Sequence, residues 1–414
     1  MEQIIPVILD SVKCNGCVGC MKRCPTEAIR VRNGKAAIQY ERCIGCGECV
    51  RVCPVQARAE APDPLSDINK YKYKVAVVPA AVYGQFANLV NPNYVRDGLI
   101  ALGFDDVVDV GACAGAYADA IREFSEQSDR LPIIGPVCPV IIRLIQFKYE
   151  HLIAHLPPVR QPERIAVKLA EARIKARGIN RAEAGIFLIA PCAADILKFK
   201  TDPDTDGVIS VKGIYLKLLA EMNKIKRPSV GSELDGEGAV SGANIAVPFG
   251  FEPRSVLTAD GIDNVLGVLE ALEHDKLTDI KYLQLYACPG GCVGGTLNIE
   301  NPYLAKTRLI RLADELDKNE VAATCEKCVE IDRDMCKRTV PYEPKNIFKL
   351  DDNRAVAIKK TMEIKRIYAA LPHLDCGACG APCCMAFAED IVRGVKAECK
   401  YVKSSVLADG RTEQ

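Results

Sequence analysis

The feature that most restricts the fold is a cysteine run that occurs twice near the start of the chain. Each copy has three cysteines separated by two residues, then a fourth after three more residues, followed directly by proline. This spacing lets three thiolates hold one 4Fe-4S cube while the fourth reaches the cube of the other copy. We therefore expect one cube on Cys14, Cys17, Cys20 and Cys53, and a second on Cys43, Cys46, Cys49 and Cys24.

The repeated run is typical of bacterial-type ferredoxins with two clusters, and it predicts such a domain over residues 1–60. Two zinc sites are the alternative. Zinc sites commonly pair two Cys-x-x-Cys units that are separated along the chain, whereas each run here is continuous. We therefore favour iron-sulfur clusters.

Composition supports metal binding in a reducing compartment. The 414 residues include 21 cysteines, most of them in tight runs, which favours metal ligation in a reducing cytosol over disulfides. Charge gives no indication of nucleic acid or of a membrane surface, because 54 basic residues balance 54 acidic ones. With no basic leader and no apolar stretch of about 18 residues, we expect a cytoplasmic protein without a transmembrane segment.

Residues 73–310 alternate between short apolar runs that predict strands and longer patterns that predict helices. The alternation favours an α/β fold with a largely parallel sheet covered on both faces. A glycine pattern, Gly236-x-Gly238-x-x-x-Gly242, has the wrong spacing for dinucleotide binding, and no predicted strand precedes it. A flavin or nicotinamide reaction would therefore need a partner subunit.

Four cysteines of this region follow predicted strands. Cys138 and Cys192 each come directly after an apolar run, and residues 280–286 lead into a loop with Pro-Gly-Gly between Cys288 and Cys292. Glycines allow the backbone to approach an inorganic cluster closely. Because ligands gather at the carboxyl ends of strands in open α/β sheets, we expect these four thiols to hold one further cube.

These segments resemble the signature segments of the catalytic domain of the FeFe (iron-only) hydrogenases, over roughly residues 73–310. In that family the segments hold a cube linked to a diiron unit, and all four cube ligands are matched here. The departures concern the diiron pocket. Val137 replaces a proton-passing cysteine, Asp195 replaces a lysine, and Ala190 and Tyr286 replace two methionines. The resemblance therefore implies that the cube is kept and the diiron unit is not.

Residues 361–414 resemble the small four-cysteine iron-sulfur domain of Rnf-type B subunits, corrinoid iron-sulfur proteins and sensory-type FeFe hydrogenases. The resemblance implies a small helical domain with one 4Fe-4S cube, held by Cys376, Cys379, Cys384 and Cys399. It leaves Cys383 as an extra cysteine without an assigned role.

A charged segment, residues 311–360, predicts a helical connector before this domain. It contains Cys325, Cys328 and Cys336, which offer three ligands for a fifth cluster without an obvious fourth. The alternative is that they are unligated helix cysteines.

The predicted fold is an α/β unit of hydrogenase-like parallel sheets with flanking helices, between an α+β two-cluster ferredoxin domain and a small helical iron-sulfur domain. The function that we favour is electron transfer within a larger redox complex of an anaerobic organism. Its partners would be redox proteins, with flavin- or nicotinamide-binding subunits among them, and no nucleic acid.

Two alternatives remain for the function. One is a sensory-type or low-activity FeFe hydrogenase that oxidises hydrogen reversibly, and the other is an iron-sulfur assembly factor. Proton supply separates the first alternative from electron transfer. Heterolytic hydrogen chemistry needs an acid or base within hydrogen-bond reach of the reacting site, and Val137 can donate nothing.

Overall fold

A computed structural model of the chain describes residues 4–243, 251–318 and 330–402. Two compact units are present. Residues 1–60 and 345–414 form the first, and residues 61–344 form the second, here called the large unit. Within the described ranges, no helix is both long and apolar enough to cross a membrane.

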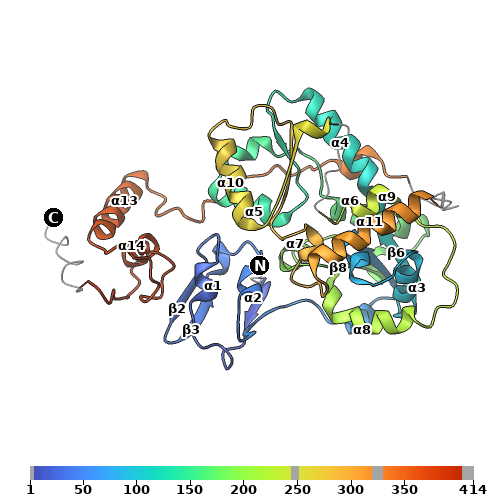
Figure 1. Ribbon diagram of the computed structural model, residues 1–414, viewed down its shortest axis with the longest axis horizontal. Coiled ribbons are helices and arrows are strands. Elements are labelled where there is room, and N and C mark those ends of the chain that lie inside the picture. The colour runs from blue at the N-terminus through green and yellow to red at the C-terminus, as the bar shows by residue number, and fades with distance from the viewer. Residues whose placement is uncertain (1–3, 244–250, 319–329, 403–414) are drawn as a thin grey trace. The chain divides into compact units, whose positions relative to one another are not determined.

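Residues 4–60 of the first unit, the ferredoxin segment, have two small antiparallel sheets (Figure 1). Strand β1 (Val7–Leu9) pairs with β4 (Arg58–Glu60), and β2 (Ile29–Arg32) pairs with β3 (Lys35–Ile38). Two one-turn helices, α1 (Gly19–Lys22) and α2 (Glu48–Arg51), occupy equivalent places in the two cysteine runs. The sequence repeat is therefore also a structural repeat.

The rest of the first unit, residues 345–402, is called the C-terminal segment. Its two main helices, α13 (Arg354–Ala369) and α14 (Cys384–Val392), pack against each other. Their contact buries an apolar cluster that includes Ile367, Leu371 and Phe387. Burial of apolar side chains of this size stabilises by about 1.5–3 kcal/mol each, so this cluster holds the cysteine loop between the helices in place.

The large unit contains two parallel sheets (Figure 1). The first has the strand order β6-β5-β8-β9, with β5 (Tyr73–Val78), β6 (Asp106–Asp109), β8 (Ala184–Ala190) and β9 (Gly207–Ser210). The second has the order β10-β11-β7, with β7 (Ile133–Ile134), β10 (Val256–Asp260) and β11 (Tyr282–Tyr286). The prediction of an α/β fold with parallel sheets is confirmed.

Helices cover the first sheet on both faces, as alternating residues of its central strands show. Ala76 and Val78 contribute to one apolar core, and Val75 and Val77 contribute to the other. The longer covering helices of the unit are α3 (Asn93–Ala101), α4 (Ala114–Gln127), α5 (Pro139–Lys148), α6 (Pro162–Ala176), α7 (Ala193–Phe199), α8 (Val211–Met222), α10 (Ile262–Glu273) and α11 (Pro302–Lys318). The unit continues past residue 310, because α11 packs on the same core.

Candidate iron-sulfur centres

Two cavities of the ferredoxin segment are each lined by four thiols. One is lined by Cys14, Cys17, Cys20 and Cys53. The other is lined by Cys24, Cys43, Cys46 and Cys49. In both cavities the fourth cysteine of one run joins the first three of the other run, which is the crossing that the spacing predicts.

The backbone around the first cavity depends on glycine. Gly16 lies between the first two cysteines of its run and has a φ of +71°, a left-handed conformation that L side chains rarely adopt. A Cβ atom at Gly16 would also lie only 2.8 Å from the carbonyl oxygen of Gly34. A larger residue at this position would push the cysteine loop off the β2–β3 hairpin.

The same hydrogen bond to sulfur occurs once in each repeat. The backbone N–H of Ala28 donates to Cys24 Sγ, and that of Ala57 donates to Cys53 Sγ, both at 3.2 Å. Hydrogen bonds to the ligand sulfurs are one of the main influences on the reduction potential of a cluster. The two cavities are therefore built alike at their crossing cysteines.

A buried guanidinium supplies positive charge to both cavities. Arg58 is 4% exposed, and its Nε and Nη2 atoms have no hydrogen-bond partner among the described residues. Burial raises the pKa of Cys20 and that of Cys49, the latter to about 12, and the charge of Arg58 opposes both shifts. A buried, incompletely paired cation between four-thiol cavities fits anionic clusters, because it would otherwise be costly to bury.

Four thiols also converge in the large unit. Cys138 directly precedes α5, Cys192 directly precedes α7, and Cys288 and Cys292 follow the end of β11. Burial raises the pKa of Cys192, and charges on Cys288 and Cys292 raise it further. The charge on Cys138 likewise raises the pKa of Cys292. The structure therefore brings the predicted residues together, from strands that belong to two different sheets.

The environment of Cys138 suits a thiolate ligand. The backbone N–H groups of Val140, Ile141 and Ala287 hydrogen-bond to it and work against the rise in pKa that burial causes. Such N–H groups stabilise negative charge on sulfur. Among the described residues, no group of three or more His, Cys, Asp or Glu side chains is arranged for a single ion. A cube differs, since each thiolate bonds to a different iron atom.

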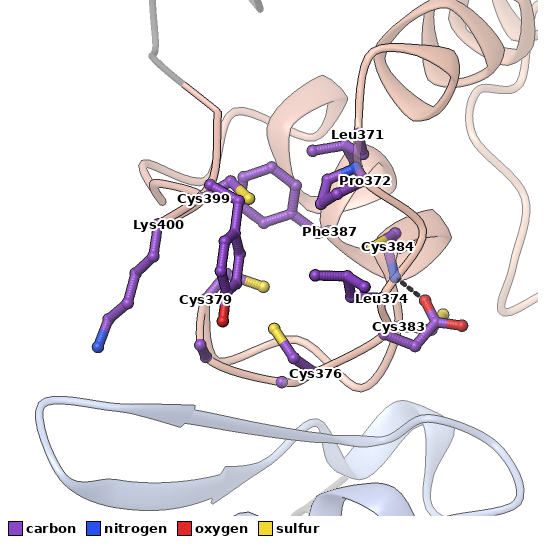
Figure 2. Close-up of a pocket in the computed structure, with 14 residues that line it drawn as sticks. Leu371, Pro372, Leu374, Cys376, Cys379, Cys383, Cys384, Phe387, Cys399 and Lys400 are labelled. Atoms are coloured by element: carbon purple, nitrogen blue, oxygen red, sulfur yellow. Dashed lines mark hydrogen bonds between the residues drawn. The ribbon is translucent and has the colours of Figure 1, made fainter.

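A fourth set of thiols surrounds a cavity in the C-terminal segment (Figure 2). Its lining includes Cys376, Cys379, Cys383, Cys384 and Cys399. Apolar side chains complete the wall, among them Leu371, Leu374 and Phe387. Leu371 and Phe387 are buried, whereas Leu374 is 57% exposed.

Cys383 differs from its neighbours because its sulfur has other partners. It lies at the N-terminal cap of α14 and accepts a hydrogen bond from the N–H of Ala386 at 3.3 Å. It also donates to Glu27 Oε1 of the ferredoxin segment at 3.4 Å. Because Cys383 lines the cavity together with Cys384, the assignment of Cys384 as the ligand stays a prediction.

Comparison with known protein families assigns the three parts of the chain. Residues 6–54 match the 4Fe-4S dicluster domain, residues 72–223 match the iron-only hydrogenase large subunit, C-terminal domain, and residues 371–401 match an Fe-S cluster family. The middle segment is thus similar to the C-terminal domain of the iron-only hydrogenase large subunit. The predicted domain order is therefore confirmed. The matched part of the hydrogenase family includes Cys138 and Cys192, and the loop of Cys288 and Cys292 follows it.

Solved FeFe-hydrogenase structures resemble this chain. A variant of FeFe-hydrogenase HydA1 from Chlamydomonas reinhardtii is 17% identical, with 68% of this chain and 98% of that chain covered and a TM-score of 0.49. An apo HydA1 variant from the same organism is 15% identical, with the same coverage and a TM-score of 0.47. A HydA(deltaEFG) structure that concerns stepwise H-cluster assembly is 16% identical over the same shares, with a TM-score of 0.47. No curated protein matches the chain significantly.

In the hydrogenase-like domain, Asp195 lies against one of the predicted ligands. Its Oδ2 atom is 3.2 Å from Cys192 Sγ, and the residue is 6% exposed. Burial, and then the charge of Glu163 in α6, raise the pKa of Asp195 to about 7. The carboxyl group can therefore hold a proton near neutral pH.

The sequence analysis missed a buried amine in the same helix. Lys198 lies one turn after Asp195 in α7, and its Nζ is buried without a hydrogen-bond partner in the described part of the chain. Burial lowers its pKa to about 7, although Glu163 and Asp195 act in the opposite direction. The i, i+3 spacing of an acid and a base on one helix was the available signal. Its burial was not visible in the sequence.

Val137 and Tyr286, two other departures from the hydrogenase pattern, make contacts with residues outside the four-thiol site. Val137 packs against an apolar core, and its carbonyl accepts a hydrogen bond from Gln161 at 3.2 Å. Tyr286 is 3% exposed, and its hydroxyl accepts from Gln284 at 2.9 Å and donates to the carbonyl of Ser241. Neither side chain offers a proton to the four-thiol site.

Of the three connector cysteines, Cys325 and Cys328 lie outside the described residues. Cys336 ends α12 (Arg333–Cys336) and is 4% exposed in the core of the large unit. Its sulfur donates to the carbonyl of Ala116 in α4 at 3.7 Å. The fifth cluster thus stays a prediction.

Proposed function

We propose that this protein transfers electrons through four 4Fe-4S cubes and lacks the diiron subsite of catalytic FeFe hydrogenases. Two cubes would occupy the ferredoxin cavities, one the four-thiol site of the hydrogenase-like domain, and one the C-terminal cavity. A cube takes up and releases single electrons and needs no proton donor. The convergence of thiols at four separate places is the observation that carries this proposal.

The chain's own residues support such a role in three ways. Backbone N–H groups at Cys24 and Cys53 stabilise charge on sulfur. The buried Arg58 favours the added electron at both ferredoxin sites. Around the middle site, the Val137 side chain carries no acid or base, and the Tyr286 hydroxyl is bonded to Gln284 and to the carbonyl of Ser241, so neither supplies the acid or base that heterolytic hydrogen chemistry needs.

We also propose that the protein belongs to a larger redox complex in a reducing compartment such as the cytoplasm. The reason is chemical. Single-electron carriers need a donor and an acceptor, and the sequence contains no flavin or nicotinamide signature. Redox subunits with such cofactors would supply both.

A sensory-type or low-activity FeFe hydrogenase is the second candidate, and Lys198 favours it. A buried amine near Asp195 could place positive charge close to the middle site, where the family has its lysine. Anaerobically purified protein separates the two candidates. We expect about 16 iron atoms per chain, at four per cube, and no reduction of a viologen dye by hydrogen. Hydrogen-dependent dye reduction would favour the second candidate, and zinc in place of iron would exclude both.

A further inference from the structure

Helix α14 of the C-terminal segment carries a buried carboxylate that binds two arginines of the ferredoxin segment. Asp390 accepts from Arg30 through both oxygens, at 2.7 and 2.9 Å, and from Arg32 at 2.7 Å. The side chains of Arg30 and Asp390 are only 6% and 3% exposed. Exposed ion pairs contribute little to stability, but breaking a buried one leaves an uncompensated charge.

The neighbouring Glu389 makes a second ion pair across the same contact. It binds Arg42, which directly precedes the predicted ligand Cys43, and it also binds Arg393 of its own helix. Burial alone would raise the pKa of Glu389, but Arg42 and Arg393 lower it below its usual value. The carboxylate is therefore charged at neutral pH, as an ion pair requires.

The cysteine loop before α14 also contacts the ferredoxin segment. Lys22 Nζ at the end of α1 donates to the carbonyl of Pro382 at 2.6 Å, and the N–H of Val31 in β2 donates to that of Gly380 at 3.0 Å. Gly380 has a φ of +80°, and a Cβ there would lie 1.9 Å from the carbonyl oxygen of Val31. Figure 2 shows this loop next to the ferredoxin ribbon.

We propose that this contact is a fixed electron-transfer junction, in which the cube of the C-terminal segment exchanges electrons directly with the ferredoxin cubes. Helix α1 contains Cys20 and is followed by Cys24, one predicted ligand from each ferredoxin set. The loop that contacts α1 carries Cys376 and Cys379. Ligand-bearing backbone from all three sites therefore meets at one place. In each exchange one cube is oxidised by one electron, another is reduced, and no proton moves.

The junction explains two features that the clusters alone do not. A Cβ at Gly377, next to Cys376, would lie 3.0 Å from Met21 Cε, so the two ligand loops approach closely. Cys383 donates to Glu27, so the extra thiol belongs to the contact. The inference rests on the proposed function, because it needs loaded cubes on both sides.

Electron paramagnetic resonance of the full chain tests the junction. In dithionite-reduced protein, we expect spin–spin splitting between the C-terminal cube and the ferredoxin cubes. A Cys379→Ser variant, which lacks the C-terminal cube, gives the reference for the remaining signals. A wild-type spectrum equal to that reference plus one isolated cube would overturn the proposal. It would leave the electron-transfer function standing, whereas missing iron in the wild type would contradict that function.

The ion pairs are tested by two matched substitutions. Asp390→Asn removes the buried charge, and Asp352→Asn removes a fully exposed one in the same segment, which forms only a surface pair with Lys349. We expect Asp390→Asn to lose the splitting and to exchange amide hydrogens of residues 29–32 at least about tenfold faster, with Asp352→Asn unchanged. Unchanged splitting and exchange in Asp390→Asn would overturn the assignment. If Asp390→Asn loses iron, Arg32→Gln is used in its place, because Arg32 is only partly buried and binds the same carboxylate. Its splitting and amide exchange are then compared with those of Asp352→Asn.

Discussion

Arg30 and Asp390 are 360 residues apart in the sequence, yet they form a two-point ion pair with both side chains buried. Arg32 adds a third hydrogen bond to the same carboxylate. A pair of this kind is expensive to break, because the remaining guanidinium would stay buried without its counter-charge. The beginning and the end of the chain therefore form one structural unit.

Loss of this carboxylate should destabilise the first unit strongly. For Asp390→Ala we expect a loss of about 3–5 kcal/mol, the usual effect of removing one partner from a buried pair. The measurement is the denaturant midpoint at which the signal of the C-terminal cube disappears. Lys349→Ala, which breaks an exposed pair, should change stability by no more than about 0.5 kcal/mol. Equal midpoints for the two variants would contradict the role of Asp390.

The two adjacent cysteines at the start of α14 should behave differently. Cys384→Ser should remove the C-terminal cube and lower the iron content from about 16 to about 12 atoms per chain. Cys383→Ser should keep all the iron, since a hydroxyl can replace the thiol both as the helix cap and as the donor to Glu27. Iron analysis of the two variants tests which cysteine is the ligand. If Cys383→Ser loses iron and Cys384→Ser keeps it, Cys383 is the ligand instead.

The crossing of the ferredoxin cysteines predicts which variants should share a phenotype. Cys24→Ser and Cys46→Ser should remove the same spectroscopic signal, because both thiols line one cavity. Cys17→Ser and Cys53→Ser should remove the other. Low-temperature electron paramagnetic resonance distinguishes the two. If Cys24→Ser and Cys17→Ser affect the same cube, each run closes on itself and the crossing is wrong.

Arg58 should control the potentials of both ferredoxin cubes. Replacement by Gln removes a buried positive charge that favours the added electron, so both cubes should become harder to reduce. We expect each potential to fall by at least about 59 mV, a tenfold change for one electron. Lys13→Gln is the control, because Lys13 is exposed and its charge is screened. A redox titration in which the two variants shift equally would remove the special role of Arg58.

The spacing of cysteines along the chain was the strongest guide to the cluster sites that the sequence offered. The grouping of Cys14, Cys17 and Cys20 with Cys53 follows from a short-range pattern, and the structure places these thiols around one cavity. The contacts of Cys383 were not accessible in this way, because its sulfur caps α14 and meets Glu27, which lies 356 residues away in the sequence. The spacing of the motif does not encode that contact.

Long-range contacts were outside the reach of sequence patterns. Helices α6 and α7 contribute to the same apolar core, where Lys198 is buried and where Glu163 of α6 adds to the rise in the pKa of Asp195. From sequence alone, Asp195 places a carboxylate where the family has a lysine, which is unfavourable beside a diiron unit unless a proton neutralises it. In the structure it can hold a proton near neutral pH, so charge repulsion excludes a diiron unit less firmly than the substitution implies. The case against that unit depends more on Val137 and Tyr286.

A double variant tests whether the pocket can be restored. Val137→Cys adds a proton donor and Asp195→Lys adds the missing cation, and neither change alone supplies both. If this variant gains a diiron unit after coexpression with hydrogenase maturases, those two positions are what excludes it. If it gains none, Tyr286 or the surrounding pocket is responsible.

Infrared spectroscopy of the unmodified protein, coexpressed with hydrogenase maturases, is the most direct test of the central claim. Carbonyl and cyanide ligands of a diiron unit absorb in a region where protein does not, so the measurement needs no turnover. A protein that holds only a cube at Cys138, Cys192, Cys288 and Cys292 should show no such bands while it keeps about 16 iron atoms. Carbonyl and cyanide bands in the unmodified protein would contradict the electron-transfer account and establish a hydrogenase-type site in its place.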